Sequence, residues 1–453
     1  MRKKQLNEKG IIEKYSRMAE KNNQFDMELY NKYNVKRGLR NADNTGVLVG
    51  LTKIGDVHAY VWENGVKVPV EGILFYRGIN VNDFVLGFQK EKRFGFEECC
   101  YLLLFGELPS RDQLREFKEL LRVNRTLPAG FTRDMILKAP SRNIMNKLAR
   151  SVLVSYSYDD NPEDSSIENI LRQCIELIAK FPVMAAYGYQ AYSHYYLGNS
   201  LHIHNPIYNY DTAENLLHLI RPDGKFTRSE AEILDLALVL HAEHGGGNNS
   251  TFVTHVVAST GTDTYSAIAA AIGSLKGSKH GGANLKVMGM MEDIKDHVKD
   301  WKDEEEVLYY LKKILSKEAF DRSGLIYGIG HAVYTLTDPR AILLKAKASE
   351  LAEEKGMQEE YNLYKLVEKL APRAFCDMKK SDKVLCANVD FYSGFVYKML
   401  NIPVELYTPI FAIARIAGWC AHLIEEIMVA GKIIRPAYKN VADITEYVPL
   451  SER

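Results

Sequence analysis

The chain has 453 residues, of which 46% are hydrophobic and 26% are charged, as in an ordinary globular protein. Its 58 basic and 58 acidic residues cancel, so no overall charge favours nucleic acid or an anionic membrane surface as a partner. No apolar run is long enough to span a bilayer, and no apolar segment follows the basic amino-terminal residues as in a secretory signal. These features predict a cytoplasmic protein with no membrane partner, in which any anionic ligand is held by a few local arginines.

The cysteines and histidines do not form a metal-binding pattern in the sequence. Six cysteines are scattered without a CxxC spacing, and Cys99 and Cys100 are adjacent, which suits neither a disulfide framework nor a zinc site. His241 and His244 could share one helix face, but no third ligand accompanies them at a suitable spacing. We therefore expect free thiols, no metal and no cofactor.

The first elements predicted along the chain are two short helices, at 11–18 and 27–33, followed by a β-hairpin. Asn64-Gly65 supplies the positive φ angles of a tight turn between two β-rich runs, His58–Trp62 and Val66–Val70. Residues 73–76 are predicted to add a further short strand. Strand signals nearly stop after this point.

Helical periodicity dominates from about residue 81 onward. Gly106 is a suitable helix stop, Thr227 and Glu230 form a candidate capping box, and Pro182 is expected to break or kink its helix. The predicted fold class is therefore all-α, with a small β-hairpin near the amino terminus. The clearest predicted helices are Phe96–Leu104, Arg111–Leu121, Ile167–Phe181, Ile233–Leu240 and Pro409–Val429.

Three blocks combine histidine with neighbouring glycines, at 241–248, 277–284 and 328–334, and the last is followed closely by Arg340. Glycine lets the backbone approach a ligand and adopt turns that other residues avoid. A histidine at such a break lies at a helix end, where its ring can face a cleft.

Downstream, one acid and two arginines stand in apolar surroundings. Asp390 lies within Asn388–Gly394, where desolvation could raise its basicity. Arg415 and Arg435 are flanked by apolar residues, and a buried arginine usually needs an anionic partner. Three histidines, three arginines and one acid suit a dicarboxylate substrate and acid–base chemistry.

These five blocks, in this order and at these separations, resemble the signature set of the citrate synthase family, with weaker similarity at 71–78 and 103–109. The resemblance implies a two-domain helical fold, with a large domain from 1–281 and 389–453 and a small domain, 282–388, that closes over the substrates. It implies condensation of acetyl-CoA with oxaloacetate and water to citrate and CoA, the first step of the tricarboxylic acid cycle. It also implies a homodimer.

The resemblance assigns three catalytic residues. His280 matches the histidine that hydrogen-bonds the thioester carbonyl, where enolate charge must be stabilised as it develops. Asp390 matches the base that removes a proton from the acetyl methyl group. His331 matches the residue that polarises and protonates the oxaloacetate carbonyl.

The resemblance also assigns substrate contacts. Planar guanidinium groups suit bidentate pairing with carboxylates. One of the implied oxaloacetate ligands, Arg435, would cross the dimer interface. The implied CoA ligands form a loop just ahead of His331. The oxaloacetate ligands are His244, Asn248, Arg340, Arg415 and Arg435, and the CoA ligands are Ile326, Tyr327, Gly328, Ile329 and Gly330.

Several alternatives stay open on the sequence alone. The same catalytic residues would serve a 2-methylcitrate synthase that uses propionyl-CoA, since one methylene is discriminated by only about 1–3 kcal/mol. A catalytically silent scaffold is the other alternative, against which the intact set of chemical groups argues. Individually, His241 could be a packed helix residue, Asp390 a helix N-cap, and Arg415 a structural ion-pair partner.

Overall fold

The computed structural model describes residues 7–41, 43, 45–330, 333–380, 384–429 and 431–453. It divides into two compact units, one formed by residues 1–50 and 435–453 and the other, the body, by residues 51–434. The terminal unit contains α1 (Glu8–Asn22), α2 (Glu28–Lys32) and a final 3₁₀ turn, Leu450–Glu452. The two short helices predicted at 11–18 and 27–33 are confirmed.

The terminal unit has no buried side chain in α1 or α2. Its carboxyl-terminal segment also leaves large apolar side chains in solvent. These include Tyr438, Ile444, Tyr447 and Leu450, which are 78% exposed or more.

The body begins with a small antiparallel sheet of β1 (Gly55–Glu63), β2 (Val66–Tyr76) and β3 (Ile79–Asn80). The predicted Asn64-Gly65 turn is confirmed, because both residues have positive φ angles, 50° and 78°. The further strand predicted at 73–76 is instead the continuation of β2. Tyr76, at the end of β2, donates from its hydroxyl to the carbonyls of Val239 and Glu243, so the sheet anchors the end of a central helix.

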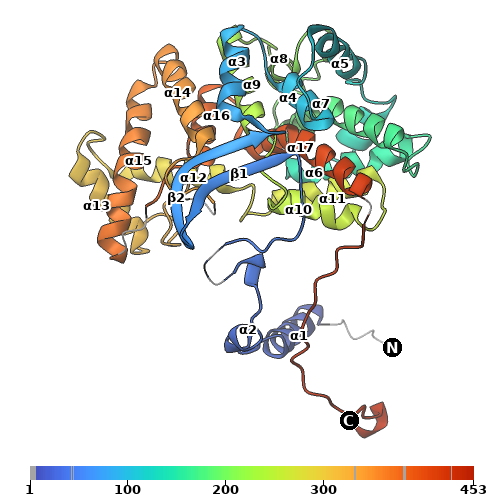
Figure 1. Ribbon diagram of the computed structural model, residues 1–453, viewed down its shortest axis with the longest axis vertical. Coiled ribbons are helices and arrows are strands. Elements are labelled where there is room, and N and C mark those ends of the chain that lie inside the picture. The colour runs from blue at the N-terminus through green and yellow to red at the C-terminus, as the bar shows by residue number, and fades with distance from the viewer. Residues whose placement is uncertain (1–6, 42, 44, 331–332, 381–383, 430) are drawn as a thin grey trace. The chain divides into compact units, whose positions relative to one another are not determined.

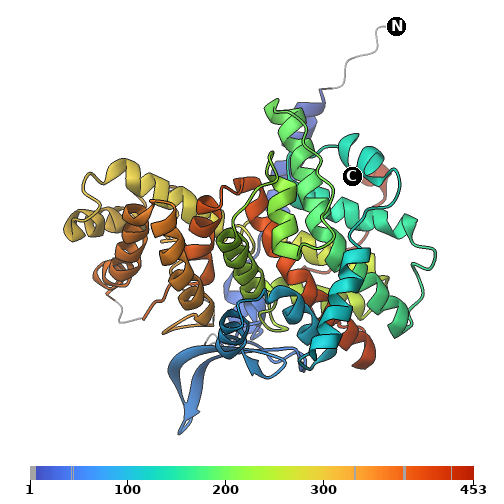
Figure 2. The same ribbon diagram turned by 90° about the horizontal axis from the view of Figure 1, so that it is seen from above.

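Helices make up most of the rest of the body, so the predicted all-α class with a minor sheet is confirmed (Figures 1 and 2). The predicted stop at Gly106 (φ 83°) and the Thr227–Glu230 capping box are both present. The helices up to residue 276 are α3 (Val81–Lys90), α4 (Phe96–Phe105), α5 (Arg111–Val123), α6 (Ile144–Ser155), α7 (Ile167–Leu197), α8 (Thr212–Ile220), α9 (Arg228–His241), α10 (Asn249–Ala258) and α11 (Thr264–Lys276), with a π-helical turn at Thr132–Leu137.

Pro182 neither ends nor interrupts its helix. α7 runs from Ile167 to Leu197 through the proline, and most of its residues around that position are buried. Packing of this long helix against α6, α8 and α17 outweighs the one hydrogen bond that proline removes. The prediction of a break was wrong for this reason.

The remaining helices follow residue 282. α13, α14 and α15 lie together on one side of the body in both views, and α17 is almost wholly buried. The predicted small domain, 282–388, runs from just before α12 to just before α16, and its closure over substrates stays a prediction. These helices are α12 (Ala283–His297), α13 (Glu304–Leu315), α14 (Pro339–Glu354), α15 (Gln358–Lys379), α16 (Val389–Met399) and α17 (Tyr407–Val429).

The core is one continuous apolar cluster that includes the centre of α17. No helix among the described residues is long and apolar enough to cross a membrane.

Candidate active site

Arg415 is the most unusual side chain of the core. It lies in the middle of α17 with none of its surface exposed, and its Nε donates to the carbonyl of His241 at 2.6 Å. Its two terminal nitrogens have no hydrogen-bond partner among the described residues. Burial lowers its pKa to about 10, opposed by the charge of Glu243. A buried guanidinium with two unused donors is suited to receive an anion.

Arg340 is the second buried arginine, at the start of α14. Its guanidinium donates to both carboxylate oxygens of Asp338, at 3.0 and 2.8 Å. The same carboxylate accepts from the backbone N–H of Val389, at the start of α16. Asp338 therefore fixes the Arg340 guanidinium and links the start of α14 to the start of α16.

His241 and His244 lie at the end of α9, beside these arginines. His241 is completely buried against the ring of Phe411, and neither of its ring nitrogens has a hydrogen-bond partner among the described residues. Burial, followed by the charges of Arg340 and Arg415, holds the pKa of His241 well below its usual value, so its imidazole is neutral. His244 is also buried, and its ring packs edge-on against Tyr334.

Asp390 lies in the first turn of α16, and Asn388 rather than Asp390 caps that helix, by accepting from the Asp390 N–H at 3.0 Å. Desolvation raises the pKa of Asp390 to about 6, and the charge of Arg340 opposes the shift. A carboxylate with such a pKa is a stronger base than an exposed one and is still mostly ionised at neutral pH.

His280 follows α11 in a tight glycine-containing turn. Its Nε2 accepts from the backbone N–H of Ser250 at 3.4 Å and lies 3.2 Å from the Ser250 hydroxyl, which in turn accepts from Trp419 Nε1. Burial lowers the pKa of His280 to about 4, so it is a neutral hydrogen-bond donor at physiological pH.

Asn248 precedes α10 and joins the same network. Its side-chain oxygen accepts from the Ser250 hydroxyl at 2.9 Å. Asn248 is thus connected to His280 through Ser250, at the amino-terminal end of α10.

The segment Ile326–Gly330 is fixed beside the first turn of α16. Gly330 N–H donates to the Cys386 carbonyl, and Asn388 N–H donates to the Gly328 carbonyl. Gly328 has a φ of 78°, and a Cβ there would lie 2.8 Å from atoms of Phe391 and Val287. Asp390 and the predicted CoA-binding backbone are therefore neighbours.

The roles of two further predicted site residues stay predictions. His331 lies outside the described residues. Arg435 belongs to the terminal unit, where its side chain is exposed, and its role as a substrate ligand stays a prediction.

Glu243 lies just after α9, between His241 and His244, and is a fully buried carboxylate enclosed by backbone. Its Oε1 accepts from Gly245 N–H at 2.5 Å and lies 3.0 Å from His422 Nε2. A Cβ at Gly55 would lie 2.5 Å from Oε1, and one at Gly418 would collide with Oε2. Glu243 therefore fixes the turn that follows His244.

Comparison with known proteins identifies the family of the chain. A family model for the carboxyl-terminal domain of citrate synthase matches residues 42–437. The chain belongs to the citrate synthase family. It is an enzyme of the citrate synthase type by the same comparisons.

Relatives within the family carry two names. The chain is 36% identical to citrate synthase of Synechocystis over 84% of its own length and 89% of that protein. It is 33% identical to citrate synthase of Haloferax volcanii, covering 92% and 99% of the two chains. It is equally 33% identical to 2-methylcitrate synthase 1 of Corynebacterium glutamicum, covering 92% and 98%.

Solved structures of the family agree with the fold. Citrate synthase from Thermotoga maritima has a TM-score of 0.72 at 29% identity, covering 92% of this chain and 99% of that one. Citrate synthase from Thermoplasma acidophilum, in a ternary complex with carboxymethyl coenzyme A and oxaloacetate, has a TM-score of 0.73 at 25% identity, with the same coverage.

Sequence reasoning missed several residues of this citrate synthase-type site. Asp338, Ser250 and Trp419 position the predicted groups without being predicted themselves. His241 was interpreted as a packed residue, but its unpartnered ring nitrogens beside Arg415 make it a further candidate. The available signal was the place of His241 at the end of an apolar helix, three residues before His244.

Proposed function

We propose that this protein is a citrate synthase that condenses acetyl-CoA with oxaloacetate and hydrolyses the product thioester to give citrate and CoA. The observation that carries the proposal is the buried Arg415 guanidinium, with two unused donors, in a cluster that also holds Arg340 and a carboxylate of raised pKa, Asp390. Such a cluster requires an anion and supplies a base. No cofactor is needed, because the CoA thioester is itself a substrate.

Oxaloacetate would be held through its carboxylates. The two free nitrogens of Arg415 suit a bidentate contact with one carboxylate. Arg340, oriented by Asp338, the neutral imidazole of His241 and the ring of His244 would provide further donors around the ligand. Arg435 is the proposed third arginine of the site.

Asp390 would remove a proton from the acetyl methyl group. Its pKa of about 6 makes it a stronger base than an ordinary aspartate. The enolate oxygen that develops on the thioester would accept from a ring N–H of the neutral His280. A neutral donor suits this step because a hydrogen bond stabilises the enolate without requiring complete proton transfer.

The enolate carbon would then attack the ketone carbon of oxaloacetate, whose oxygen takes a proton. We assign that proton to His331 because it matches the residue that has this role in the family. Water then cleaves the thioester of the condensed product, releasing the CoA thiol and the third carboxylate of citrate.

The second candidate function is 2-methylcitrate synthesis from propionyl-CoA. It is favoured by two relatives named 2-methylcitrate synthase, at 33% and 32% identity, values close to those of the citrate synthases. The residues discussed above would catalyse either reaction, so the distinction depends on the space for one methyl group.

The test is oxaloacetate-dependent thiol release from acetyl-CoA and from propionyl-CoA, for wild type, Arg415→Met and Asp390→Asn. Arg415→Met should raise the oxaloacetate KM by about 30-fold or more, since loss of one partner of a buried charge pair costs about 2–5 kcal/mol. Asp390→Asn should lower kcat with little change in that KM. Arg133→Met, on an exposed arginine, is the matched control and should behave as wild type.

The outcomes separate the candidates. Higher kcat/KM with acetyl-CoA supports citrate synthesis, and higher kcat/KM with propionyl-CoA transfers the assignment to 2-methylcitrate synthesis. No thiol release from either donor by folded wild type would contradict both.

We further propose that the enzyme is a cytoplasmic homodimer. All six cysteines are free, as suits a reducing compartment. The exposed apolar side chains of the carboxyl-terminal segment, such as Tyr438 and Ile444, suit burial against a second copy. Light scattering coupled to gel filtration measures this directly, and a monomer at micromolar concentration would contradict it.

A further inference from the structure

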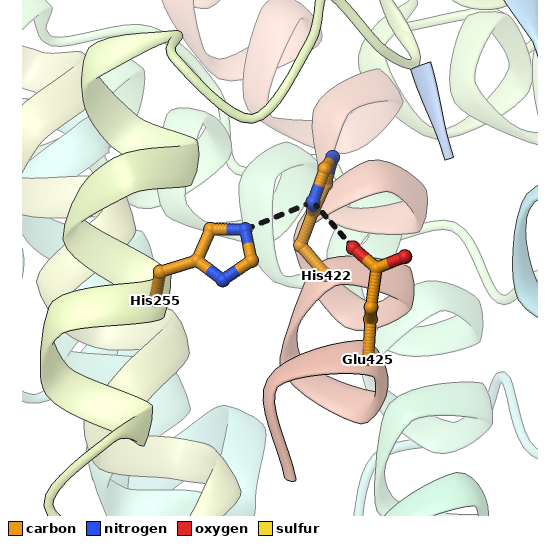
Figure 3. Close-up of side chains that lie close together, drawn as sticks. All are labelled: His255, His422 and Glu425. Carbon is orange, nitrogen blue, oxygen red and sulfur yellow. Dashed lines mark hydrogen bonds and ion pairs between the residues drawn. The ribbon is translucent and has the colours of Figure 1, made fainter. Parts of the chain in front are cut away.

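Two histidines and a glutamate outside the catalytic groups meet between α10 and α17 (Figure 3). His255 Nε2 lies 3.0 Å from His422 Nδ1, and Glu425 Oε2 lies 3.8 Å from the same His422 nitrogen. The three potential ligand atoms all lie within 4.8 Å of one another. His422 is fully buried, and the side chains of His255 and Glu425 are 12% and 14% exposed.

The hydrogen bonds on the far sides of the two rings determine where their protons are. His255 Nδ1 lies 2.7 Å from Glu426 Oε2, and His422 Nε2 lies 3.0 Å from Glu243 Oε1. An ionised carboxylate only accepts, so these two nitrogens carry the protons. The nitrogens that face each other at 3.0 Å then both present lone pairs, an arrangement that requires a positive group between them.

A shared proton would satisfy the two rings but not Glu425. Its Oε1 accepts from the Lys53 N–H at 2.7 Å, whereas its buried Oε2 has no hydrogen-bond partner among the described residues. The charge of Arg77 acts on Glu425, but its guanidinium donates to the Leu103 carbonyl through two of its nitrogens and gives Glu425 Oε2 no hydrogen bond.

We propose that His255 Nε2, His422 Nδ1 and Glu425 Oε2 bind a divalent first-row transition-metal ion, with Zn²⁺ as the best match to this ligand set. Two imidazoles and one carboxylate, with a fourth position for water, are a common zinc environment. Ligand atoms around such an ion lie about 3.3 Å apart, so the Glu425 carboxylate must approach the rings by about 1 Å. This site uses a different histidine pair from the one the sequence drew attention to.

The surroundings match those of known metal sites in a second respect. Histidine ligands of metals usually donate their other ring N–H to a carboxylate, which fixes the tautomer and raises ligand basicity. Here both histidines do so, to Glu426 and to Glu243. Glu243 also accepts from Gly245 N–H, directly after His244. The ion would therefore join α10 to α17 and hold the oxaloacetate-binding turn in place.

The experiment uses full-length protein stripped with a chelator and titrated with Co²⁺, which reports its ligands through visible absorption bands. Wild type should bind one Co²⁺ per chain with tetrahedral-type bands, and excess Zn²⁺ should abolish them. His255→Gln, at a partly buried position, should lower the Co²⁺ affinity at least tenfold. His297→Gln, on an exposed histidine of α12, is the matched control and should bind as wild type.

Further measurements keep the proposal testable if one variant folds poorly. Glu425→Gln removes the third ligand and should weaken Co²⁺ binding as His255→Gln does, with circular dichroism as the check on folding. Wild type treated with a chelator should show a raised oxaloacetate KM, and added Zn²⁺ should return that KM to its original value. Absence of visible Co²⁺ bands in folded wild type, or equal Co²⁺ affinity in wild type and folded His255→Gln, overturns the proposal and leaves a shared proton between the rings.

Discussion

Replacing Asp390 with asparagine should stabilise the folded enzyme while removing its base. Desolvation raises the pKa of this carboxyl from 3.8 to about 6 in the folded protein. A raised carboxyl pKa means that the folded state binds the proton more tightly than the unfolded state, so ionisation destabilises the fold. This cost is complete above pH 6, the folded pKa. It disappears below 3.8, the pKa of the carboxyl in the unfolded chain.

The size of the effect follows from the shift. A difference of about two pKa units corresponds to about 3 kcal/mol at about 1.4 kcal/mol per unit. Asparagine loses a favourable negative charge in the first turn of α16, worth about 0.3–1 kcal/mol, so a net gain of about 2 kcal/mol is expected at pH 8. With an unfolding entropy of about 2.1 cal/mol/K per residue, this raises Tm by about 2 °C for a chain of this length.

The assay is calorimetric unfolding of wild type and Asp390→Asn at pH 5, 6, 7 and 8. Asp83→Asn, on an exposed acid in the first turn of α3, is the control and should lower Tm slightly at each pH. The advantage of Asp390→Asn should shrink from pH 7 to pH 5. A Tm equal to or below that of wild type at pH 8, in a variant with normal circular dichroism, would refute the account of Asp390 as a desolvated carboxylate.

Three further predictions concern catalysis and assembly. The kcat/KM for acetyl-CoA should fall about tenfold per pH unit below pH 6, because the base must be ionised, and a flat profile down to pH 5 would exclude Asp390 as that base. Gly328→Ala should raise the acyl-CoA KM, since its φ of 78° and the contact with Phe391 leave no room for a methyl group, and an unchanged KM would remove this segment from the CoA site. If Arg435 completes the partner's site, co-refolding inactive Arg435→Ala with inactive Asp390→Asn should restore about a quarter of the wild-type sites. The reason is that half of the dimers are mixed and each mixed dimer has one intact site. No recovery of activity in mixed dimers would place Arg435 in its own subunit's site.

The sequence was sufficient to predict most helices and the hairpin, because their signals are local. A capping box at Thr227, a glycine after α4 and Asn64-Gly65 act through residues adjacent in the chain. A break at Pro182 was wrongly expected because the packing that keeps α7 continuous comes from helices distant in sequence. Signals from residues adjacent in the chain could be read from the sequence, whereas stabilisation by packing between distant helices could not.

The candidate site follows the same division. Arg415 was predicted to need an anion from its apolar flanks, and it is buried with two unused donors. The pairing of Arg340 with Asp338 was not predicted, although the two residues are only two positions apart, because a surface loop would look the same in sequence. His255 and His422, which are 167 residues apart, meet only in the folded chain.

The enclosure of Glu243 also constrains how this lineage can change. Gly55 has room for a hydrogen atom only, because the Glu243 carboxylate occupies the space of a Cβ there. Gly418 is constrained twice, since a Cβ there would collide with Glu243 Oε2 and would lie 2.5 Å from the Ala242 carbonyl oxygen. A side chain at Gly55 therefore becomes tolerable only after residue 243 has been shortened, whereas shortening residue 243 leaves the backbone collision at Gly418. Among diverging descendants, positions 55 and 243 should substitute together or not at all, so saturation mutagenesis one position at a time would score both as invariant although compatible pairs exist.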